Sequence, residues 1–411
     1  MKDNQAKYPQ LRFKGFTDPW DKRYLGDYVV DYTEKTTQEN QFPVLTSSQQ
    51  QGIVLQSEYF SDRQVTTDEN IGYFVLPRGY FTYRSRSDNN IFVFNRNDII
   101  DKGIISYFYP VFGLINADSN FFLRRINNGL NRQLAIAAEG TGQHVLSLKK
   151  FKKMETRFPS LPEQKQIGEI LECLDDLITV NQRKLAKLKE LKQGYLQKLF
   201  PENGSKFPQL RFAGFADAWE ERKFEDLLDS KDGVRRGPFG SALKKEFFVE
   251  NSEYVVYEQQ NAIYDNYHTR YKITKEKFDE LSKFKLNPGD FIMSGAGTIG
   301  RISRVPDGVK LGVFNQALIR FRINPEITDS EYFIQFVRAD FMQKNLTGAN
   351  PGSAITNLVP MSEVKKWEIK APHLEEQEKI GSFFKLLDDT IALHQRKLEK
   401  LQELKKGYLQ K

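Results

Sequence analysis

The chain has 411 residues, 39% of them hydrophobic, which is enough material for two or three domains with real cores. Its net charge of +7 and pI of about 9.0 are a moderate excess that favours a polyanionic partner such as nucleic acid. The single cysteine, Cys173, excludes a disulfide framework. The first ten residues lack the apolar stretch of a signal peptide, and no run of eighteen apolar residues occurs, so we expect a soluble, cytoplasmic protein.

The first recognisable segment returns about two hundred residues later. Residues 8–16 read YPQLRFKGF and residues 207–215 read FPQLRFAGF, an offset of 199 that Trp20 and Trp219 also keep. A period of this length is typical of a duplicated domain and too long for a solenoid repeat. We therefore expect two related globular domains.

Residues 21–158 and 220–371 predict two such domains, each containing many strands. Runs such as GYFVLPRGYFTYRSRS and DFIMSGAGTIGRISRV are rich in aromatic and β-branched residues and are interrupted by Gly, Pro and Asn. The two interiors differ heavily in sequence, whereas the segments that flank them agree. The sequence therefore predicts two similar frames that carry two different surfaces.

Residues 161–200 and 374–411 predict two long helices, and they form a second repeat at an offset of 213. LDD, QRKL, ELK and GYLQK match at every position, and Ser160 with Glu163 has the spacing of a capping box. Apolar residues recur at spacings of three and four, as in a coiled coil. The predicted seam consists of Leu171, Leu174, Ile178, Asn181, Leu185 and Leu188 in the first helix, and of Phe384, Leu387, Ile391, His394, Leu398 and Leu401 in the second.

The charges on these helices predict that they pair antiparallel. Residues 161–180 carry a net charge of −4 and residues 181–199 of +5, and residues 374–393 and 394–411 repeat the division with −3 and +4. An antiparallel pair places acid against base, and it brings Asn181 and His394, each near a helix midpoint, close together. The alternative is that each helix merely complements its own dipole, which explains the charges but not the shared polar midpoint.

Two further expectations follow from the pair. Each helix of about 38 residues would reach roughly 57 Å, which suits a spacer. If the two halves are related by a pseudo-twofold axis, the end of the second helix should lie near the N-terminal PQLRF segment.

The motifs that resemble catalytic or cofactor sites are weak. Residues 295–300, GAGTIG, match a dinucleotide-binding pattern, but RISRVPDG follows and predicts another strand where that fold needs a helix. The repeated pairs Asp175-Asp176 and Asp388-Asp389 place neighbouring side chains about 100° apart on a helix, so they do not readily converge on one metal ion. The four histidines lack metal-ligand spacing, and no Walker loop is present. We expect neither a catalytic centre nor a metal site in this chain.

Polar and basic loops remain as candidates for DNA contacts. Arg and Lys bind phosphates or guanine edges, and Asn and Gln bind adenine, although an ordinary solvated loop explains any one of these residues equally well. The candidates in the first domain are Arg78, Tyr83, Arg84, Arg86, Asn128, Asn131, Arg132 and Gln133. Those in the second domain are Arg235, Arg236, Ser241, Lys244, Lys245, Ser294, Arg301, Asn350, Ser353 and Thr356.

Over its whole length the chain resembles the specificity subunits of bacterial type I restriction–modification systems. The resemblance rests on the two near-identical helices with their LDD, QRKL and GYLQK segments, and on GPFGSALKK and GDFIMSGAGTIG in the second domain. It implies an α+β fold in which two mixed α/β target recognition domains in a pseudo-twofold relation are separated by two long antiparallel coiled-coil helices. The boundaries we expect are 1–159 and 201–372 for the recognition domains, and 160–200 and 373–411 for the helices.

The same resemblance implies a function. Each recognition domain would read one half of a bipartite double-stranded DNA site, and the helices would set the spacing and dock two methyltransferase subunits, which bring in up to two restriction subunits. The chain itself would be non-catalytic and hold no cofactor. The assembled complex would be an adenine-N6 DNA methyltransferase that uses S-adenosylmethionine and an endonuclease that uses ATP and Mg. The alternative from another class is a structural adaptor that holds two protein-binding domains at a fixed separation, and an enzyme with an unrecognised site comes third.

Overall fold

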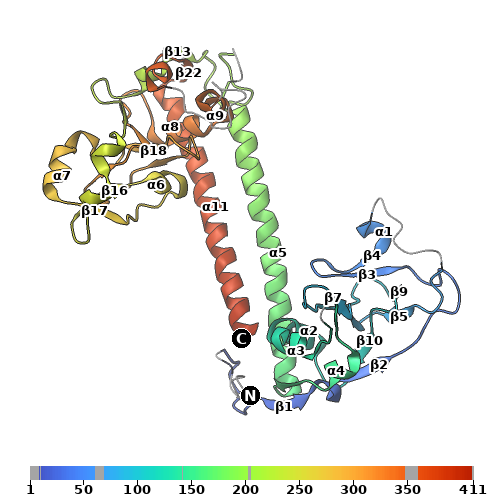
Figure 1. The fold of residues 1–411 in the computed structure, drawn as a ribbon. Helices are drawn as coiled ribbons and strands as arrows, with labels where there is room; N and C mark the ends of the chain where they lie inside the picture. Colours follow the sequence, from blue (N-terminus) through green and yellow to red (C-terminus); the bar gives the residue numbers. More distant parts are fainter. Residues whose placement is uncertain are drawn as a thin grey trace. The chain divides into compact units, whose positions relative to one another are not determined.

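The computed structural model describes residues 9, 11–60, 69–140, 142–201, 205–347 and 360–409. The chain divides into two compact units: unit 1 comprises residues 1–183 and 396–411, and unit 2 comprises residues 184–395. This division cuts both long helices, α5 (Leu161–Lys198) and α11 (Leu374–Leu409), so each unit contains part of each helix (Figure 1). The predicted boundaries between recognition domains and helices therefore stay a prediction. Of the helices within the described ranges, none is both long and apolar enough to cross a membrane.

Unit 1 is built on a four-stranded antiparallel sheet with the strand order β2-β10-β6-β8. Its core is largely aromatic, with Phe81 stacked on Phe112 and in edge contact with Phe122 from helix α2. The strands are β1 (Asp21–Tyr24), β2 (Val29–Tyr32), β3 (Leu45–Ser48), β4 (Gly52–Leu55), β5 (Phe74–Pro77), β6 (Phe81–Tyr83), β7 (Arg86–Ser87), β8 (Phe94–Arg96), β9 (Lys102–Ile105), β10 (Val111–Leu114), β11 (His144–Val145) and β12 (Glu155–Phe158). The short helices are α1 (Gln56–Tyr59), α2 (Ser119–Gly129), α3 (Asn131–Ala137) and α4 (Leu148–Lys152).

Unit 2 contains a four-stranded sheet with the order β14-β21-β18-β19 and a second sheet with the order β15-β17-β16-β20. Phe200, just beyond the end of α5, is buried in this unit against Trp219 and Tyr332. The strands are β13 (Glu220–Lys223), β14 (Val234–Arg236), β15 (Phe248–Val249), β16 (Tyr254–Tyr257), β17 (Tyr271–Ile273), β18 (Phe291–Ser294), β19 (Ile302–Arg304), β20 (Gly312–Phe314), β21 (Leu318–Phe321) and β22 (Glu368–Ala371). The helices are α6 (Gln259–Tyr264), α7 (Lys275–Glu280), α8 (Ser330–Arg338), α9 (Asp340–Thr347) and α10 (Met361–Val364).

The four-stranded sheets of the two units correspond strand by strand. Phe81 of β6 lies opposite Phe112 of β10, and Phe291 of β18 lies opposite Phe321 of β21 in the same position. In the same way, β6 pairs with the short strand β8, and β18 pairs with the short strand β19. Helix α2 follows β10, and helix α8 follows β21. The additions differ: unit 1 has the pairs β3-β4 and β5-β9, whereas unit 2 has its second sheet. The prediction of two similar frames with two different surfaces is confirmed.

The PQLRF segments are attached to the starts of the long helices by the same ion pair in each unit. Arg12 donates two hydrogen bonds of 2.8 Å to Glu163, and Arg211 donates two of 2.7 Å to Glu376. The two glutamates are only 1% and 2% exposed, so each buried carboxylate depends on its arginine. Glu163, which the sequence placed in a local capping box, also accepts a hydrogen bond from Trp20. Its recorded partners therefore come from distant parts of the chain.

A glycine in each long helix allows a close approach to a shorter helix of the same unit: α5 approaches the start of α2, and α11 approaches the start of α8. A Cβ atom on Gly168 would lie 2.3 Å from Asp118 Oδ1, and one on Gly381 would lie 2.4 Å from Asp329 Oδ1. Both aspartates are helix N-caps, because Asp118 accepts from the backbone N–H three residues on in α2 and Asp329 does the same in α8. The close packing at these two positions thus requires glycine, which has no Cβ atom.

Gly381→Ala is expected to destabilise the protein by about 2–4 kcal/mol, because overpacking adds to the loss of a cap. Gly194→Ala is the matched control in α5, where nothing lies within 4 Å of the added atom. That substitution should stabilise the helix by up to about 1 kcal/mol. Chemical unfolding of both variants measures the two effects. Equal effects of the two substitutions would contradict the packing role of Gly381.

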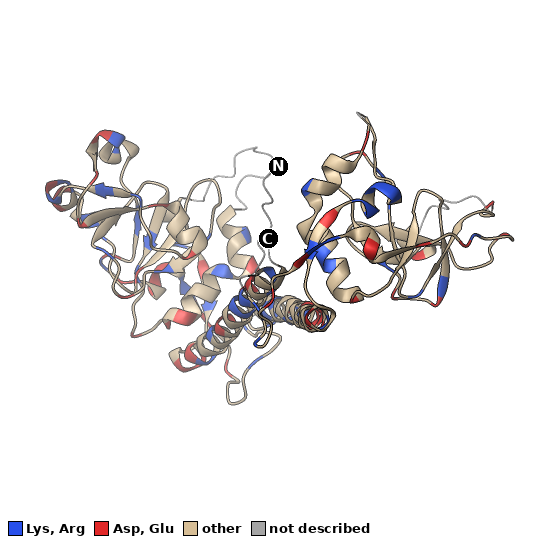
Figure 2. Cartoon of the chain, turned by 90° about the horizontal axis from the view of Figure 1, so that it is seen from below, with Lys and Arg blue, Asp and Glu red and all other residues tan. Residues whose placement is uncertain are grey.

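The long helices run antiparallel within each unit. In unit 1, Asp175 of α5 pairs with Lys405 of α11, and in unit 2, Lys192 pairs with Asp388 at 2.6 Å. In unit 2, Tyr195 of α5 also packs edge-on against Phe383 of α11, so the contacts move back along α11 as they move forward along α5. Burial lowers the pKa of Lys192, and the hydrogen bond to Asp388 partly offsets this. Figure 2 shows acidic and basic residues along both helices. The antiparallel prediction is confirmed.

All twelve residues of the predicted seam are buried or partly buried, but Leu171 and Phe384 lie in the cores of their own units, so the seam between the helices stays a prediction. Asn181, 5% exposed, donates a hydrogen bond to the Leu177 carbonyl one turn earlier in its own helix. Its predicted closeness to His394 concerns residues of different units and stays a prediction. Within unit 1, the ring of Phe13 stacks on Tyr408 with centroids 5.7 Å apart. The end of the described part of α11 therefore lies beside the N-terminal PQLRF segment, as expected.

Candidate nucleic-acid interface

In unit 1, polar loops gather at one end of the four-stranded sheet. Strand β6 leads into residues 84–93, and residues 106–110 lead into β10, which is antiparallel to β6, so both segments lie at the same end of the sheet. Two bonds to the Phe108 carbonyl, from the backbone N–H and the hydroxyl of Ser85, tie the segments together. The hairpin β3-β4 completes this end of the unit.

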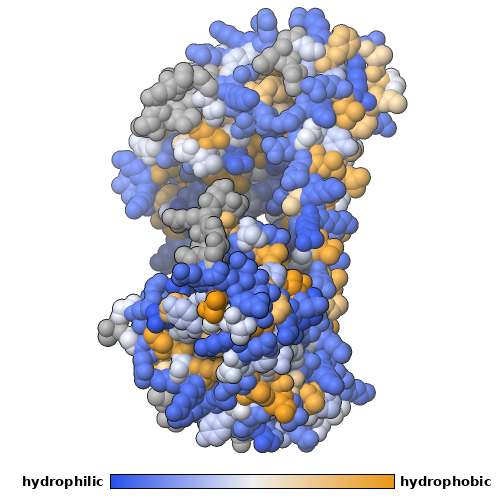
Figure 3. All heavy atoms as spheres, turned by 90° about the vertical axis from the view of Figure 1, so that its right-hand side faces the viewer, coloured by the Kyte–Doolittle hydropathy of each residue, from blue (hydrophilic) through white to orange (hydrophobic). Residues whose placement is uncertain are grey.

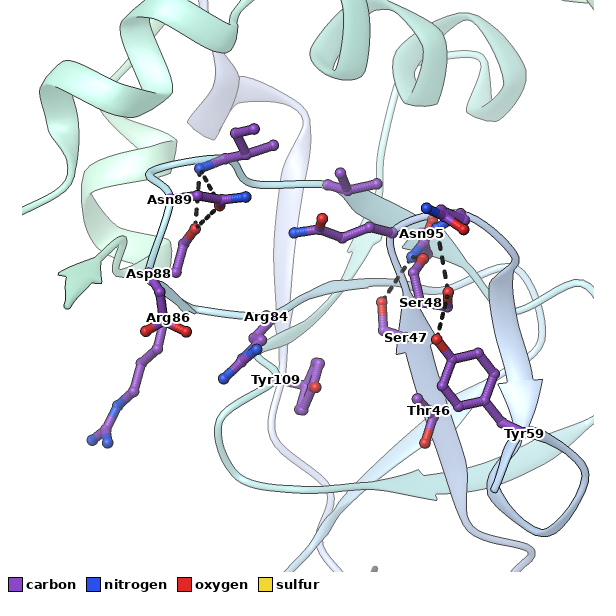
Figure 4. A pocket seen from close by; sticks show the side chains of 15 residues that line it. Thr46, Ser47, Ser48, Tyr59, Arg84, Arg86, Asp88, Asn89, Asn95 and Tyr109 are labelled. Carbon is purple, nitrogen blue, oxygen red and sulfur yellow. Dashed lines mark hydrogen bonds between the residues drawn. The ribbon is translucent and has the colours of Figure 1, made fainter. Parts of the chain in front are cut away.

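These segments enclose a polar pocket of about 490 Å³. In Figure 4, Arg84 and Tyr109 lie between Asn89 on one side and Ser47 and Ser48 on the other. The pocket is lined by Thr46, Ser47, Ser48, Gln49, Gln50, Tyr59, Arg84, Arg86, Ser87, Asp88, Asn89, Ile91, Val93, Asn95 and Tyr109. Hydroxyl, amide and guanidinium groups of this kind form hydrogen bonds with base edges and phosphates.

The walls of this pocket are held in place by hydrogen bonds between its segments. Asn95 of β8 donates to Ser47 Oγ at 2.8 Å and to the Ser48 carbonyl at 2.9 Å. Ser87 donates to Asn89 Oδ1 at 2.8 Å, which shapes the loop after β6. Because the polar groups are positioned by one another, the pocket is preorganised for a polar ligand.

Two arginines of the pocket are available to an anion. In the part of the chain that the structure describes, neither Arg84 nor Arg86 has a carboxylate partner, and both are exposed. The guanidinium of Arg86 lies 4.3 Å from the centroid of the Phe108 ring, which orients it without neutralising it. Burial raises the pKa of Tyr109, and the nearby charge of Arg84 partly offsets this. With two arginines against Asp88, the pocket lining has a net positive charge and many hydrogen-bonding groups.

Helix α3 borders the same loop. Asn90 donates to the Ala135 carbonyl of α3 at 3.2 Å. The predicted candidates Asn131, Arg132 and Gln133 occupy the first turn of this helix, where Asn131 and Arg132 are exposed. Asn128 of α2 is exposed but donates its amide to the Arg124 carbonyl. Three of these four residues thus belong to a helix that contacts the loop after β6 at Ala135, and none of the four lines the pocket.

In unit 2, three segments meet at the corresponding end of the corresponding sheet. Residues 237–241 follow β14, residues 295–301 follow β18, and residues 315–317 precede β21. The Gly237 N–H donates to the Leu318 carbonyl and the Gly295 N–H donates to the Ala317 carbonyl. Gln259 of α6 donates to the Ala296 carbonyl. The GPFGS and GAGTIG segments, far apart in the sequence, therefore lie together at one end of the sheet, and we call such a group of loops a recognition edge.

The GAGTIG segment is a turn between two antiparallel strands. Strand β19 follows it and pairs with β18, so the helix that a dinucleotide site needs is replaced by a strand, as the sequence predicted. Among the described residues, no three His, Cys, Asp or Glu side chains come together as a metal site. A pocket of about 600 Å³, lined in part by this turn, also contains Lys192, Arg301 and Arg338 together with Asp265 and Asp340. Basic and acidic side chains are therefore mixed in this pocket, as they are in the unit 1 pocket, where Asp88 accompanies Arg84 and Arg86.

A cluster of ion pairs supports the strand that leads to the GPFGS segment. Asp232 pairs with Arg235 at 2.7 Å, with the buried Arg320 at 2.6 Å and with Arg322 at 3.0 Å, and Arg322 also pairs with Asp290 at 2.8 Å. Burial raises the pKa of Asp232, but hydrogen bonds from Arg320 and Arg235 outweigh it and hold the pKa below its usual value. Arg235 is thus a structural side chain, whereas Arg236 points away from this cluster and is exposed.

Two predicted DNA contacts were wrong. Tyr83 is completely buried, and its hydroxyl donates to the Leu146 carbonyl, because residues alternate between the two faces of a strand and Tyr83 faces the core while Arg84 faces out. Ser294 is also buried and bonds to the Thr298 carbonyl and the Arg301 N–H, so it shapes the turn. Both residues support the loops that follow them.

The other predicted candidates differ in their exposure and in whether a carboxylate already pairs with them. Arg78 is exposed but bound to Asp101 and to the carbonyls of Asp98 and Ile99. Lys244 lies 3.8 Å from Glu246. The exposed candidates without a carboxylate partner in the described ranges are Arg84, Arg86, Arg132, Arg236, Lys245 and Arg301, and Ser241 is also exposed. Asn350, Ser353 and Thr356 lie outside the described residues.

Several residues of these edges were not predicted from the sequence. Ser47, Ser48 and Asn95 enter the pocket from the β3-β4 hairpin and from β8, and Phe239 projects from the GPFGS segment. The run TSSQQQG at residues 46–52 is a turn signal between apolar residues that could have indicated a polar hairpin. Which loops share one end of a sheet cannot be read from such signals.

Two copies of one frame, each presenting different polar loops at the same sheet end, define a duplicated recognition protein. The family model for the type I restriction modification DNA specificity domain matches residues 18–190 and again residues 216–403. Because these matches cover most of the chain, the protein belongs to this family.

Two curated relatives come from Methanocaldococcus jannaschii. The type I restriction enzyme MjaVIII specificity subunit is 22% identical over 275 residues, which cover 65% of this chain and 63% of the relative. The putative type I restriction enzyme MjaX specificity subunit is 23% identical over 274 residues, which cover 66% and 61%. The alignments thus span about three fifths of these relatives.

Two solved structures share the fold over nearly the whole chain. The S subunit of a type I restriction–modification system from M. genitalium matches with a TM-score of 0.58 and 13% identity, covering 98% of this chain and 97% of that one. A structure titled as the structural basis of complex assembly and conformational transition of the type I R-M system matches with a TM-score of 0.50 and 15% identity, covering 98% of both chains. At these identities the likeness concerns the fold alone.

Proposed function

We propose that this chain is the DNA sequence-specificity subunit of a type I restriction–modification complex, and that each unit reads one half of a bipartite site. The observation that carries the proposal is the pair of equivalent sheet ends with unlike polar loops. One frame duplicated with two different surfaces suits an asymmetric, two-part target, because each surface can present its own hydrogen-bond pattern to the bases.

The unpaired arginines at these ends supply the affinity for the phosphate backbone. Arg84 and Arg86 in unit 1 and Arg236 in unit 2 are exposed cations beside polar side chains. Cations of this kind position the protein on the duplex, and the neighbouring hydroxyl and amide groups read sequence. We therefore assign positioning to the arginines and base reading to residues such as Ser47 and Asn89.

The long helices set the spacing and dock the partner subunits. Besides the seam, each helix has a line of exposed apolar residues, which we call the outer stripe, and spacings of 3, 7 and 11 residues place its members on one helix face. The outer stripe consists of Leu177, Val180 and Leu191 on α5 and of Leu386, Leu393 and Leu404 on α11, with exposures between 41% and 67%. Figure 3 shows apolar residues exposed among hydrophilic ones on the face it draws.

The chemistry of the complex resides in its partners. Two methyltransferase subunits would bind S-adenosylmethionine and methylate adenine at N6, and up to two restriction subunits would bind ATP and Mg and cleave DNA. The present chain recognises the DNA sequence, sets the spacing of the half-sites and binds the other subunits, and it is not itself catalytic. A base must leave the stack before it is methylated, which the methyltransferase performs at the position that the specificity subunit selects.

The test is the salt dependence of DNA binding by the complex reconstituted with its methyltransferase subunits. Binding should weaken steeply with salt, and Arg236→Ala should reduce the slope of log K against log salt by about 1, because one phosphate contact is lost. Arg78→Ala is the matched control, since that guanidinium is already bound to Asp101 and to the Asp98 carbonyl in the loop between β8 and β9. A structural adaptor for proteins would show no salt-dependent, sequence-selective DNA binding in any variant.

A further inference from the structure

The most exposed large apolar side chain among the described residues is Phe239. It is 89% exposed, and it stands in the GPFGS segment after β14. No ring contact is recorded for it within the part of the chain that the structure describes, although phenylalanine is among the residues most often buried. An aromatic ring held in water on a recognition edge indicates a ligand surface.

The backbone around Phe239 is held rigidly. The Gly237 N–H donates to the Leu318 carbonyl at 2.9 Å, and a Cβ atom on Gly237 would lie 1.9 Å from the Asn315 carbonyl oxygen. Pro238 is buried, and the Ala242 N–H donates to the Phe239 carbonyl at 2.9 Å, closing a turn of 3₁₀ helix (Gly240–Leu243). The ring is therefore projected by a fixed turn in which only glycine fits the closest approach.

Basic residues precede and follow Phe239 in the sequence. Residues 236–245 contain Arg236, Lys244 and Lys245 and no acidic residue, and Lys244 pairs with Glu246, which follows directly. Arg236 and Lys245 are exposed, and neither has a carboxylate partner within the described ranges. An apolar ring between two exposed cations matches the base stack and phosphates of a nucleic acid better than the apolar face of a protein.

We propose that Phe239 is an apolar wedge that enters the base stack of the DNA half-site bound by unit 2 and partly unstacks one base step. This inference rests on the proposed function and adds to it a residue that deforms the DNA. Unstacking requires free energy that differs between base steps, so the wedge would favour flexible pyrimidine–purine steps without any hydrogen bond to them. The adjacent cations would hold the phosphates on either side of the opened step.

The experiment compares the wild-type complex with Phe239→Ala and with Phe207→Ala, a matched control that removes an exposed ring (54% exposed) from the flanking segment of the same unit. Duplexes carry the half-sequences obtained by mapping methylated adenines in the host genome, with 2-aminopurine at each adenine in turn. Binding affinity, its salt slope, and 2-aminopurine fluorescence, which rises on unstacking, are measured.

Phe239→Ala is expected to weaken binding about tenfold or more, to leave the salt slope unchanged, and to abolish a fluorescence rise at one base step of one half-site. A rise at the methylated adenine caused by base flipping should persist. Phe207→Ala should bind as the wild type does.

Wild-type affinity and fluorescence in the Phe239→Ala complex would overturn the wedge while leaving the proposed function intact. Loss of methyltransferase assembly in that variant would assign the ring to a protein contact and overturn it equally. Failure of the wild-type complex itself to bind its site would refute the proposed function. A Phe239→Trp variant that keeps the affinity and the fluorescence rise separates loss of the ring from loss of folding.

Discussion

Four alanines inserted after Thr179 in α5, together with four after Lys400 in α11, should widen the tolerated gap between the half-sites by nearly two base pairs. Each insertion adds roughly 6 Å of helix, against 3.4 Å for each base pair. Both half-sequences should stay unchanged, because the loop ends of the two sheets are not altered. Mapping of methylated adenines in cells that carry the variant measures the gap and both half-sequences at once.

The two insertions are placed so that the paired helices lengthen together. In the register of the Asp175–Lys405 pair of unit 1, the points after Thr179 and after Lys400 lie opposite one another. This ion pair, the Lys192–Asp388 pair of unit 2 and the predicted seam on either side are thereby kept. Four alanines in the exposed turn at Asp307 and Gly308 are the control and should leave the gap as it is. An altered half-sequence, or an unaltered gap in the lengthened variant, would contradict the assignment of spacing to the helices.

Leu386→Ser combined with Leu393→Ser should prevent the methyltransferase subunit from binding at the outer stripe of unit 2. The two side chains are 67% and 60% exposed, so the isolated chain should fold normally. Burying a leucine in an interface contributes about 1.5–3 kcal/mol, and the loss of two corresponds to binding that is roughly a hundredfold or more weaker. Sedimentation or size-exclusion chromatography with the purified partner measures assembly.

A substitution on another face of the same helix controls for this result. Ala392 is exposed and lies on the side of α11 away from the outer stripe, so Ala392→Ser introduces a hydroxyl without removing a docking contact. It should assemble as the wild type does. Undiminished assembly of the double variant would place the methyltransferase elsewhere on the chain.

The sequence by itself determined the duplication, the two long helices and their antiparallel direction. These properties are periodic: Leu171, Leu174 and Leu185 are buried because they recur on one helix face, and the division of charge leaves one direction in which acids meet bases. The sequence also indicated that GAGTIG joins two strands. Local spacing and composition predict such features because residues close together in the sequence are enough to produce them.

Only the tertiary structure decided which side chains form the recognition edges. Arg84 and Tyr83 are adjacent, yet one lines the pocket and the other lies in the core, and Ser47 reaches the same pocket from a hairpin almost forty residues earlier. Glu163 has the spacing of a local cap, but its carboxylate binds Arg12, 151 residues away in the sequence. The physical reason is that exposure and partnership depend on which strands become neighbours in a sheet and which end of it their loops share. Those are contacts between distant segments, and no pattern within a single segment records them.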